Sequence, residues 1–454
     1  MFTRILVANR GEIACRIIRA CRDLGIETVA VYSQADKEAL HVELADQAIC
    51  IGAASSKESY LNIENILSAA VLTESQAIHP GFGFLSENAK FAQMCTECQI
   101  SFIGPSAQVI SMMGDKAQAR EKMIEAKVPV IPGSDGEIDS LENGLAQAKQ
   151  VGFPLFIKAS AGGGGKGIRR VNSLDDFERQ YQAARQEAEN AFGNGAVYLE
   201  RIIFPAKHIE FQILADHFGH VIHLGERDCS LQRNNQKVIE EAPSPYISEV
   251  LRQKMGQDAV RAAEAVGYQN AGTIEFLVDE KGDYYFMEMN TRIQVEHPIT
   301  EMITGVDLVE WQIRIASGEK LALRQEDIQF TGHSIECRLN AEDPFNGFRP
   351  SPGLVSFVHL PKGGMGVRLE SALYSGYQIP PYYDSMLAKL IVHAPNRMQA
   401  IQKMSRLLSE LAVEGVPTNH EFLLSLLTSE GFLQANYDTA YLETTFLPQW
   451  KDQA

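Results

Sequence analysis

The sequence has little positive charge, which argues against two classes of partner. Its 454 residues include 41 lysines and arginines against 58 aspartates and glutamates, a formal net charge of −17. Such an acidic chain is a poor ligand for nucleic acid or for an anionic membrane surface. It also has no apolar run as long as a membrane span, and its first residues already have the pattern of a strand. We therefore expect neither a membrane anchor nor a signal peptide.

Cysteine is also scarce. The seven cysteines are an odd, scattered set, unlike the disulfide framework of a small secreted protein, so a reducing cytoplasm is expected. Cys95 and Cys98 form a lone C-x-x-C pair, which we interpret as incidental and not as a zinc or redox site. The rest of the composition, 45% hydrophobic and 22% charged, is ordinary for a globular enzyme of about two or three domains.

The first hundred residues alternate between strand and helix patterns. Residues 5–8 have a strand pattern, Gly11–Leu24 has apolar residues at helical spacing, and residues 28–32 form the next strand pattern. This order predicts a βαβ unit of a parallel sheet. The turn at 9–12 lacks the G-x-G-x-x-G fingerprint, so no dinucleotide site is predicted there.

Two later segments have features of ligand sites. The loop His79–Asn88 follows a strand, and loops at the carboxyl ends of strands bind ligands in open α/β sheets, although a plain Gly-Pro turn is the alternative. Residues 115–130 have a helical pattern with Lys116 in the first turn. A cation there opposes the helix dipole and suggests a nearby anion. From 331 onward the chain is rich in strand patterns, and helices are expected at 397–414 and 419–428.

A glycine-rich loop lies at Ser160–Gly167. Four successive glycines between Lys158 and Lys166 allow backbone N–H groups to approach and bind phosphates. The segment does not match the P-loop pattern G-x-x-x-x-G-K-[ST] at either end, and a strand pattern follows it. It therefore predicts a strand–loop–strand lid over a phosphate, with a bland flexible hairpin as the alternative.

The most informative stretch is Phe286–Pro298, where an apolar strand leads into a dense polar run. A short turn joins it to an earlier strand, so Glu275 and Glu288 are expected to face each other across a hairpin, while Asn290 shares the face of Glu288. Two carboxylates and a carbonyl oxygen suit Mg²⁺, and Arg292 supplies a fork for a small oxyanion. The alternative is a salt-bridged surface hairpin.

Two further polar patterns are ambiguous by themselves. In the stretch 208–214, His208, Glu210 and Gln212 alternate with apolar residues, so they share one face of a strand that could simply be solvated. The run Glu226–Lys237 is strongly polar and could be a solvated loop.

Taken in order, these segments resemble the biotin carboxylases, an ATP-grasp family. The resemblance extends from Met1 to about Phe446 and is strongest to the free-standing biotin carboxylase subunits of bacterial acetyl-CoA carboxylase. The segments that carry it are Asn9–Ala14, His79–Asn88, the four-glycine loop, Glu226–Ser230, Glu288–His297, Gly332–Arg338 and Pro380–Ser385.

The resemblance implies an α/β fold, α+β in parts, with three domains. These are an N-terminal parallel-sheet domain at 1–114, an ATP-grasp domain at 115–330 with a mobile glycine-rich lid subdomain at about 131–203, and a C-terminal mixed strand and helix domain at 331–446. It also implies ATP- and bicarbonate-dependent carboxylation of biotin through carboxyphosphate. This is the first half-reaction of acetyl-CoA carboxylase, which supplies malonyl-CoA for fatty acid synthesis.

The implied cofactors are ATP and Mg²⁺ or Mn²⁺, with carrier-bound biotin as substrate. The chain has no Met-Lys-Met biotinylation motif, so a separate biotin carboxyl carrier protein and carboxyltransferase subunits are expected as partners. A homodimer is also implied.

The resemblance further assigns roles to individual residues. The ATP-binding set is Lys116, Lys158, Gly164, Gly165, Glu200, His208, Gln232 and Lys237. The metal ligands are Glu275, Glu288 and Asn290. The bicarbonate set is Lys237, Arg292, Gln294, Val295 and Glu296, with Glu296 as the base. The biotin set is Phe82, Gly83 and Arg338, of which Arg338 steadies the biotin enolate. Arg292, Glu296, Lys237 and Arg338 are the implied catalytic residues.

The chain departs from the family's usual residues at two positions, and three alternative functions remain open. Many relatives have tyrosine where this chain has Phe82, and histidine where it has Asn235. One alternative is a subunit of another biotin-dependent carboxylase, acting on pyruvate or propionyl-CoA. A second is a different ATP-grasp ligase, which should lack the run 292–296 and Arg338. A third is a non-catalytic nucleotide sensor, which would be expected to have lost its base or metal ligands.

Overall fold

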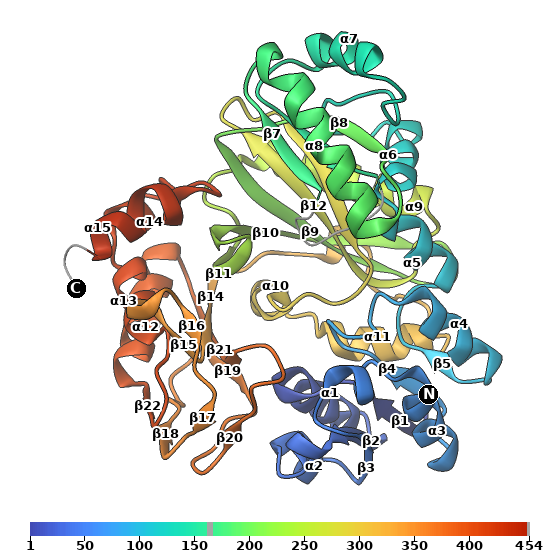
Figure 1. The fold of residues 1–454 in the computed structure, drawn as a ribbon. Helices are drawn as coiled ribbons and strands as arrows, with labels where there is room; N and C mark the ends of the chain where they lie inside the picture. The colour runs from blue at the N-terminus through green and yellow to red at the C-terminus, as the bar shows by residue number, and fades with distance from the viewer. Residues whose placement is uncertain (161–166, 452–454) are drawn as a thin grey trace. The chain divides into compact units, whose positions relative to one another are not determined.

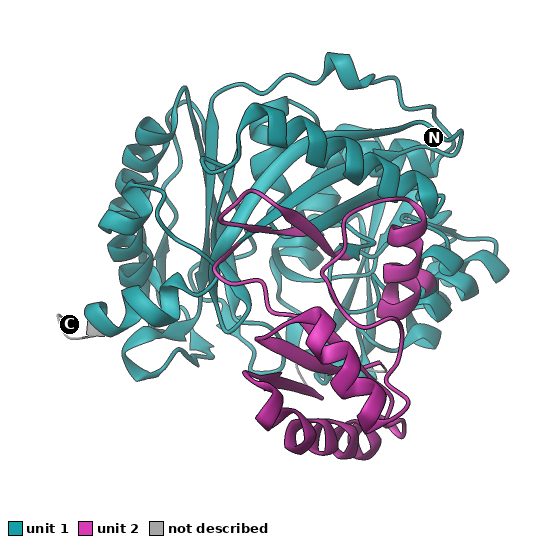
Figure 2. Cartoon of the chain, turned by 90° about the horizontal axis from the view of Figure 1, so that it is seen from above, with its two compact units in different colours: residues 1–111, 207–275, 289–454 teal, residues 112–206, 276–288 magenta. Residues whose placement is uncertain are grey.

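The computed structural model describes residues 1–160 and 167–451 (Figure 1). The chain forms two compact units. Unit 1 comprises residues 1–111, 207–275 and 289–454, and unit 2 comprises residues 112–206 and 276–288 (Figure 2). The predicted glycine-loop residues Gly164 and Gly165 lie outside the described residues. The three-domain division expected from the sequence stays a prediction.

Unit 1 begins with a five-stranded parallel sheet in the order β3-β2-β1-β4-β5. The β1–α1–β2 segment confirms the predicted βαβ unit. The loop 80–88 directly follows β4, as expected. The elements are β1 (Arg4–Val7), α1 (Gly11–Asp23), β2 (Glu27–Ser33), α2 (Leu40–Leu44), β3 (Gln47–Gly52), α3 (Ile63–Leu72), β4 (Ala77–His79), α4 (Ala89–Glu97) and β5 (Ser101–Phe102).

An eight-stranded sheet has the order β13-β12-β9-β10-β11-β14-β21-β19. Strands that precede and follow residue 330 in the sequence belong to this one sheet, because β14 pairs antiparallel with β11. Glu336 is opposite Glu240, and Cys337 is opposite Ile239. The strands are β9 (Ala206–Ala215), β10 (Val221–Arg233), β11 (Gln236–Ala242), β12 (Asn270–Asp279), β13 (Tyr284–Asn290), β14 (His333–Asn340), β19 (Val367–Ser371) and β21 (Met386–Ala394). The predicted hairpin of 273–278 and 284–287 is confirmed as β12 and β13.

The two polar patterns that the sequence left open are buried in this sheet. Every residue of β9 is buried, and the run Glu226–Lys237 forms most of β10, a two-residue turn and the start of β11. The solvated-loop interpretation of that run is therefore wrong. Buried polar groups are tolerated only when they are hydrogen-bonded or paired, and these side chains pair with one another across the strands.

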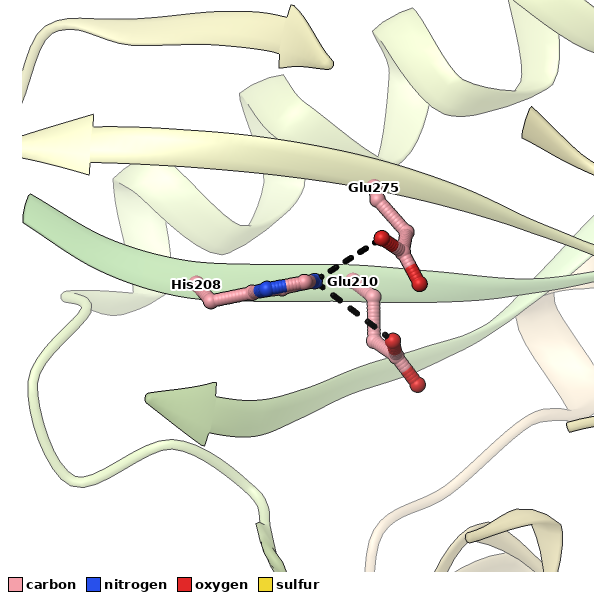
Figure 3. Close-up of side chains that lie close together, drawn as sticks. All are labelled: His208, Glu210 and Glu275. Atoms are coloured by element: carbon pink, nitrogen blue, oxygen red, sulfur yellow. Dashed lines mark ion pairs between the residues drawn. The ribbon is translucent and has the colours of Figure 1, made fainter. Parts of the chain in front are cut away.

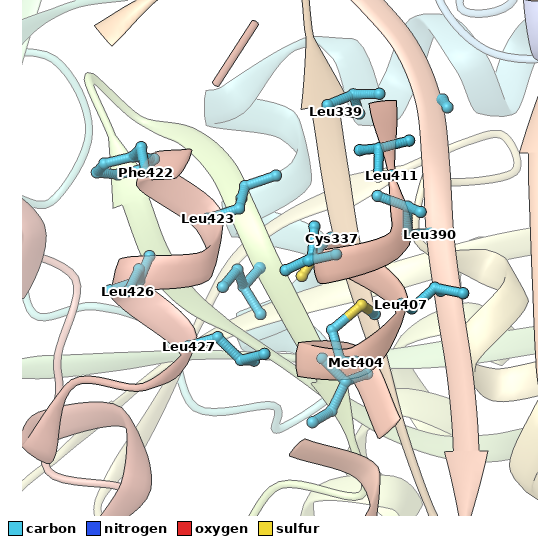
Figure 4. Packing of buried hydrophobic residues seen from close by; sticks show 14 of the residues in the cluster. Cys337, Leu339, Leu390, Met404, Leu407, Leu411, Phe422, Leu423, Leu426 and Leu427 are labelled. Atoms are coloured by element: carbon cyan, nitrogen blue, oxygen red, sulfur yellow. The ribbon is translucent and has the colours of Figure 1, made fainter. Parts of the chain in front are cut away.

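The carboxyl-terminal part of the sheet is covered by helices. Cys337 and Leu339 of β14 and Leu390 of β21 pack in one core cluster with Met404 of α12 (Arg397–Glu410) and Phe422 of α13 (His420–Leu427) (Figure 4). The helix expected over 397–414 ends at Glu410. Residues 412–414 instead form β22 (Ala412–Glu414), which pairs antiparallel with β18 (Phe357–His359). Strand pairing there satisfies backbone groups that the end of a helix would leave unpaired.

The remaining elements of unit 1 are short connections and covering helices. They are α9 (Glu249–Ala265), α10 (His297–Thr304), α11 (Leu308–Ala316), β15 (Glu342–Asp343), β16 (Arg349–Pro350), β17 (Gly353–Leu354), β20 (Gln378–Ile379), α14 (Glu430–Leu433) and α15 (Leu447–Lys451). None of the helices in the described part of the chain combines the length and apolar character that a bilayer crossing requires.

Unit 2 contains a three-stranded antiparallel sheet, β7-β6-β8, packed against α7 (Leu141–Val151) and α8 (Leu174–Phe192). The strands are β6 (Leu155–Ala159), β7 (Ile168–Val171) and β8 (Val197–Arg201). Because β6 and β7 pair with each other, the two strands predicted on either side of the glycine-rich segment are confirmed.

The helix expected over 115–130 is shorter than predicted. It is α6 (Lys116–Glu125), which follows α5 (Ala107–Gly114). Lys116 occupies its first turn, as expected. Lys127 has a φ of 59°, and a residue in this left-handed conformation commonly ends a helix.

Candidate active site

Lys237 is the centre of a buried charge cluster in unit 1. Its Nζ lies 2.6 Å from Glu210 Oε2, 2.9 Å from Glu275 Oε1 and 2.7 Å from Glu296 Oε1. Three strands and one loop bring these groups together. Glu210 is on β9, Lys237 on β11 and Glu275 on β12, and Glu296 lies in the loop after β13. One ammonium therefore balances three carboxylates that would otherwise repel one another.

His208 and Glu210 are two residues apart on β9, so their side chains share a face of the strand. The His208 ring points toward the carboxylates of Glu210 and of Glu275, which is on the neighbouring strand β12 (Figure 3). His208 Nε2 lies 3.1 Å from Glu275 Oε2 and 3.8 Å from Glu210 Oε2. Gln232 Nε2 lies 2.8 Å from Nδ1, the other ring nitrogen of His208, and so fixes the orientation of the ring. The polar residues that alternate with apolar residues along β9 therefore line the candidate site.

Glu296 lies between two cations. Arg338 Nη2 is 2.9 Å from its Oε2, and Lys237 Nζ is on its other oxygen. Burial would raise the pKa of Glu296, but Lys237 and Arg338 outweigh it and hold that pKa well below 4.5. Glu275 follows the same pattern, since burial raises its pKa while Lys237 and His208 lower it further. Both carboxyls are therefore ionised at neutral pH.

The polar run after β13 binds to this cluster through its amides. Asn290 Nδ2 and Gln294 Nε2 each donate to Glu275 Oε1 at 2.9 Å. Arg292 then donates to the carbonyl oxygens of both amides, also at 2.9 Å, and its Nε donates to Glu87 at 2.8 Å. The guanidinium thus fixes the two amides that hold Glu275. Because these residues are largely buried and mutually bonded, the surface-hairpin alternative is wrong for residues 290–296.

The charge balance of the cluster suits a further cation. Four carboxylates, from Glu210, Glu240, Glu275 and Glu296, contact three cations, from Lys237, Arg227 and Arg338. His208, Glu210 and Glu275 also place ligand atoms within 4.8 Å of one another. Mg²⁺ prefers oxygen ligands, so the carboxylates of Glu210 and Glu275 suit this metal, whereas the His208 nitrogen does not. Glu288, the other predicted ligand, is exposed near the end of β13.

The predicted biotin residues lie in the loop after β4 and on β14. Phe82 is half-buried, and its carbonyl accepts a 2.7 Å hydrogen bond from Asn9 Nδ2. Gly83 is exposed with a φ of 70°, a conformation that favours glycine. The loop also supplies Glu87, the partner of Arg292. The structure therefore connects the loop His79–Asn88 to the candidate bicarbonate residues.

Four predicted residues belong to unit 2. Lys158 and Glu200, both predicted ATP ligands, form an ion pair between β6 and β8. Lys116 is exposed at the start of α6, where Asp115 caps the helix by accepting from the N–H groups of Ala117 and Gln118. Glu288 is the fourth. Lys158 and Glu200 thus contact each other, and their assignment to ATP stays a prediction.

Sequence reasoning missed several buried charges that hold the site. Arg227, fully buried, donates to Glu210 at 2.6 Å and to Gln212 and Thr300. Glu240 accepts from Arg338 Nε at 2.6 Å, and burial raises its pKa to about 7 against the opposing charge of Arg338. The sequence did offer a signal, because these charged residues lie within otherwise apolar strand patterns. Charged residues in a core are rarely found without partners.

The departure at Asn235 has a structural explanation. Asn234 and Asn235 form the two-residue turn between β10 and β11, with φ values of 49° and 62°. Tight hairpins with two left-handed residues favour asparagine, because its short polar side chain tolerates that conformation. The asparagines thus fix the register that places Gln232 opposite Lys237.

Comparison with known proteins identifies relatives along the whole chain. Three family models match: the biotin carboxylase N-terminal domain at residues 1–110, the ATP-binding domain of the carbamoyl-phosphate synthase L chain at 115–324, and the biotin carboxylase C-terminal domain at 336–444. The chain is 57% identical over 442 residues to a biotin carboxylase of Nostoc, covering 97% of this chain and 99% of the relative. It is 52% identical to the small subunit of 2-oxoglutarate carboxylase of Hydrogenobacter thermophilus, covering 98% and 93%.

Solved structures have the same fold. A biotin carboxylase of Campylobacter jejuni in complex with β,γ-ATP superposes with a TM-score of 0.93 at 49% identity, covering 97% of this chain and 98% of that one. The biotin carboxylase domain dimer of the Hydrogenobacter thermophilus enzyme, crystallised with MgADP, ADP and bicarbonate, gives a TM-score of 0.92, covering 98% and 97%. This chain, with a parallel N-terminal sheet, a central ATP-grasp domain and a C-terminal domain, therefore belongs to the biotin carboxylases, a family of ATP-dependent ligases.

Proposed function

We propose that this biotin carboxylase performs the first half-reaction of acetyl-CoA carboxylase. Bicarbonate attacks the γ-phosphate of ATP to give carboxyphosphate and ADP, and biotin on a separate carrier protein then receives the carboxyl group. Carboxyltransferase subunits would use the product to make malonyl-CoA for fatty acid synthesis. The support is the 57% identity to a biotin carboxylase of Nostoc that has almost the same length as this chain.

The observation that carries the chemistry is Glu296 held between Lys237 and Arg338. Bicarbonate must lose its proton as its oxygen attacks phosphorus, and a carboxylate is the expected acceptor. Bicarbonate is an anion that would compete with Glu296 for Lys237. Weakening that ion pair would raise the pKa of Glu296 and make it a stronger base when the substrate is bound.

Lys237, Arg292 and Gln294 would bind bicarbonate beside Glu296. Phosphoryl transfer depends mainly on positioning and on neutralising charge, and a bound Mg²⁺ would supply part of that neutralisation. Lys116, Lys158, Glu200, His208 and Gln232 would bind ATP, and Glu275, Glu288 and Asn290 would hold the metal. Each of these roles is a proposal that rests on the family resemblance and on the chemistry of the residues.

Arg338 would act in the second step. Carboxyphosphate breaks to carbon dioxide and phosphate, the phosphate removes the ureido proton of biotin, and an oxyanion develops on the ureido oxygen. A guanidinium beside that oxygen stabilises the developing charge. Phe82 and Gly83 would line the biotin side of the site.

A second candidate is the biotin carboxylase subunit of another carboxylase. The 52% identity to a 2-oxoglutarate carboxylase subunit and the 51% identity to a pyruvate carboxylase subunit of Methanothermobacter favour it. Purifying the partner proteins with the chain and assaying acetyl-CoA, pyruvate and 2-oxoglutarate as acceptors would distinguish these functions. We also propose a homodimer, because a relative of 52% identity was crystallised as one.

The half-reaction is tested with the purified chain alone. With Mg²⁺, ATP and bicarbonate, phosphate release should accelerate when free biotin is added, because biotin draws off carboxyphosphate. Chelation of Mg²⁺ by EDTA should stop the reaction, and excess Mg²⁺ should restore it. An ATPase rate that does not respond to biotin or bicarbonate would contradict the proposed function.

Glu288→Gln should reduce turnover roughly a hundredfold, because one charge that stabilises the transferred phosphoryl group is lost while the side-chain shape is kept. The Mg²⁺ concentration needed for half-maximal rate should rise as well. Glu280→Gln, on the turn between β12 and β13, is the matched control and should behave like the wild type. Normal turnover of Glu288→Gln at saturating Mg²⁺ would remove Glu288 from the metal site.

A further inference from the structure

Lys389, on β21, is a buried cation that none of the roles above uses. Its side chain is completely buried, and lysine is rarely found in such a position unless its ammonium group is paired. Its Nζ donates to the backbone carbonyl of Val295 at 2.8 Å and lies 3.2 Å from Glu12 Oε1 on α1. Isolated burial of an ammonium costs several kcal/mol, so a position this enclosed indicates a specific requirement for the charge there.

The sheet places Lys389 beside the candidate catalytic residues. In the antiparallel pairing of β14 with β21, Lys389 is directly opposite Arg338. Directly opposed residues project their side chains to the same face of a sheet. Arg338 contacts the side chain of Glu296, and Lys389 contacts the backbone one residue before it. Two neighbouring cations on one sheet face thus hold consecutive residues of the same loop.

The carbonyl that Lys389 holds belongs to the peptide between Val295 and Glu296. Because a trans peptide is planar, fixing the direction of this carbonyl also fixes the direction of the Glu296 N–H and limits rotation of the backbone that carries the Glu296 side chain.

We propose that Lys389 is a positioning residue for the bicarbonate step, which it serves by locking the Val295–Glu296 peptide against β21. The proposal rests on the proposed role of Glu296. It assigns Lys389 no contact with substrate. It predicts that losing the lysine impairs the use of bicarbonate more than the use of ATP.

The test compares Lys389→Met with a matched variant of Lys403, a lysine of α12 that also donates to a backbone carbonyl of β21. Lys389→Met should raise the KM for bicarbonate roughly tenfold, as expected for the loss of one charge-assisted hydrogen bond, while the KM for ATP changes little. Lys403 also donates to backbone carbonyls, at 2.6 Å to His393 of β21 and at 2.7 Å to Met365. Lys403→Met should leave both KM values unchanged.

A double variant separates positioning from folding. Lys389→Met leaves Glu12 without its cation in a site where burial already raises the pKa of that carboxyl against the charge of Lys389. Adding Glu12→Gln removes the unpaired charge, so the double variant should regain thermal stability while the KM for bicarbonate stays raised. If stability and bicarbonate KM recover together, or if the double variant does not fold, Lys389 is structural and the proposal is wrong.

The proposed function and the proposed role of Lys389 are tested by different results. A wild-type chain without bicarbonate-dependent phosphate release would overturn the half-reaction itself. An active wild type with unchanged bicarbonate KM in Lys389→Met would overturn only the role of the lysine.

Discussion

Glu296→Gln is expected to abolish bicarbonate-dependent phosphate release and biotin carboxylation together. Glutamine keeps the shape of the side chain but cannot accept the bicarbonate proton, and loss of a general base typically costs roughly 10²–10⁴-fold in rate. The fold should survive, because Lys237 keeps Glu210 and Glu275 and Arg338 keeps Glu240 as partners. Phosphate release and carboxybiotin formation are measured in the same reaction.

Arg338→Gln is the informative comparison for this prediction. If Arg338 acts on the biotin oxyanion, its loss should impair carboxylation much more than ATP hydrolysis, since the biotin anion that it stabilises develops only after carboxyphosphate has formed. The ratio of phosphate released to carboxybiotin formed should therefore rise in Arg338→Gln and not in Glu296→Gln. The same ratio in both variants would show that the two residues do not divide the steps in this way.

Lys237→Met should be the most destabilising single change in the site. It leaves Glu210, Glu275 and Glu296 buried close together without their common cation, and breaking a buried ion pair from one side typically costs about 3–5 kcal/mol. Thermal unfolding should show this loss at pH 7, and activity should be lost with it. Lys122→Met removes an exposed ion pair with Glu125 on α6 and should unfold like the wild type.

The destabilisation of Lys237→Met should depend on pH, with a definite sign. In the folded wild type, the lysine helps to hold the pKa of Glu275 and of Glu296 below the ordinary value of 4.5 despite burial. A carboxyl with a lowered folded pKa stabilises the protein above its unfolded pKa and loses that contribution as pH falls through the folded value. The difference in stability between wild type and variant should therefore be fully present at pH 7 and narrow as pH falls below the ordinary value of 4.5. A difference that stays constant as pH falls below 4.5 would show that the lysine does not stabilise the ionised carboxyls.

Local sequence determined much of the secondary structure. Apolar spacing at Gly11–Leu24 between two strand patterns was enough to place β1, α1 and β2, because these elements depend on short-range periodicity. The hairpin of β12 and β13 and the strands on both sides of the glycine-rich segment were predicted for the same reason. Boundaries were less accurate, as at Glu410, where pairing of β22 with β18 replaced the last turn of the expected helix.

The chemistry of the site was also indicated by sequence, through the order of its motifs and the residue types after β13. Arg292 and Glu296 are recognisable because a dense polar run of this composition has few structural uses in an apolar strand pattern, whereas Arg338 lies outside that run and was assigned by the family resemblance alone. Their identities required a family resemblance, since composition and periodicity do not specify a base or its substrate.

Only the tertiary structure determined which charges meet. Glu210, Lys237, Glu275 and Glu296 are separated by tens of residues, and their contacts depend on the order and register of strands in the eight-stranded sheet. The pairing of β14 with β11 on one side and β21 on the other brings Arg338 and Lys389 to Glu296. Register arises from the packing of whole strands and not from local propensity, and a shift of one residue in a strand would turn its charged side chains to the opposite face.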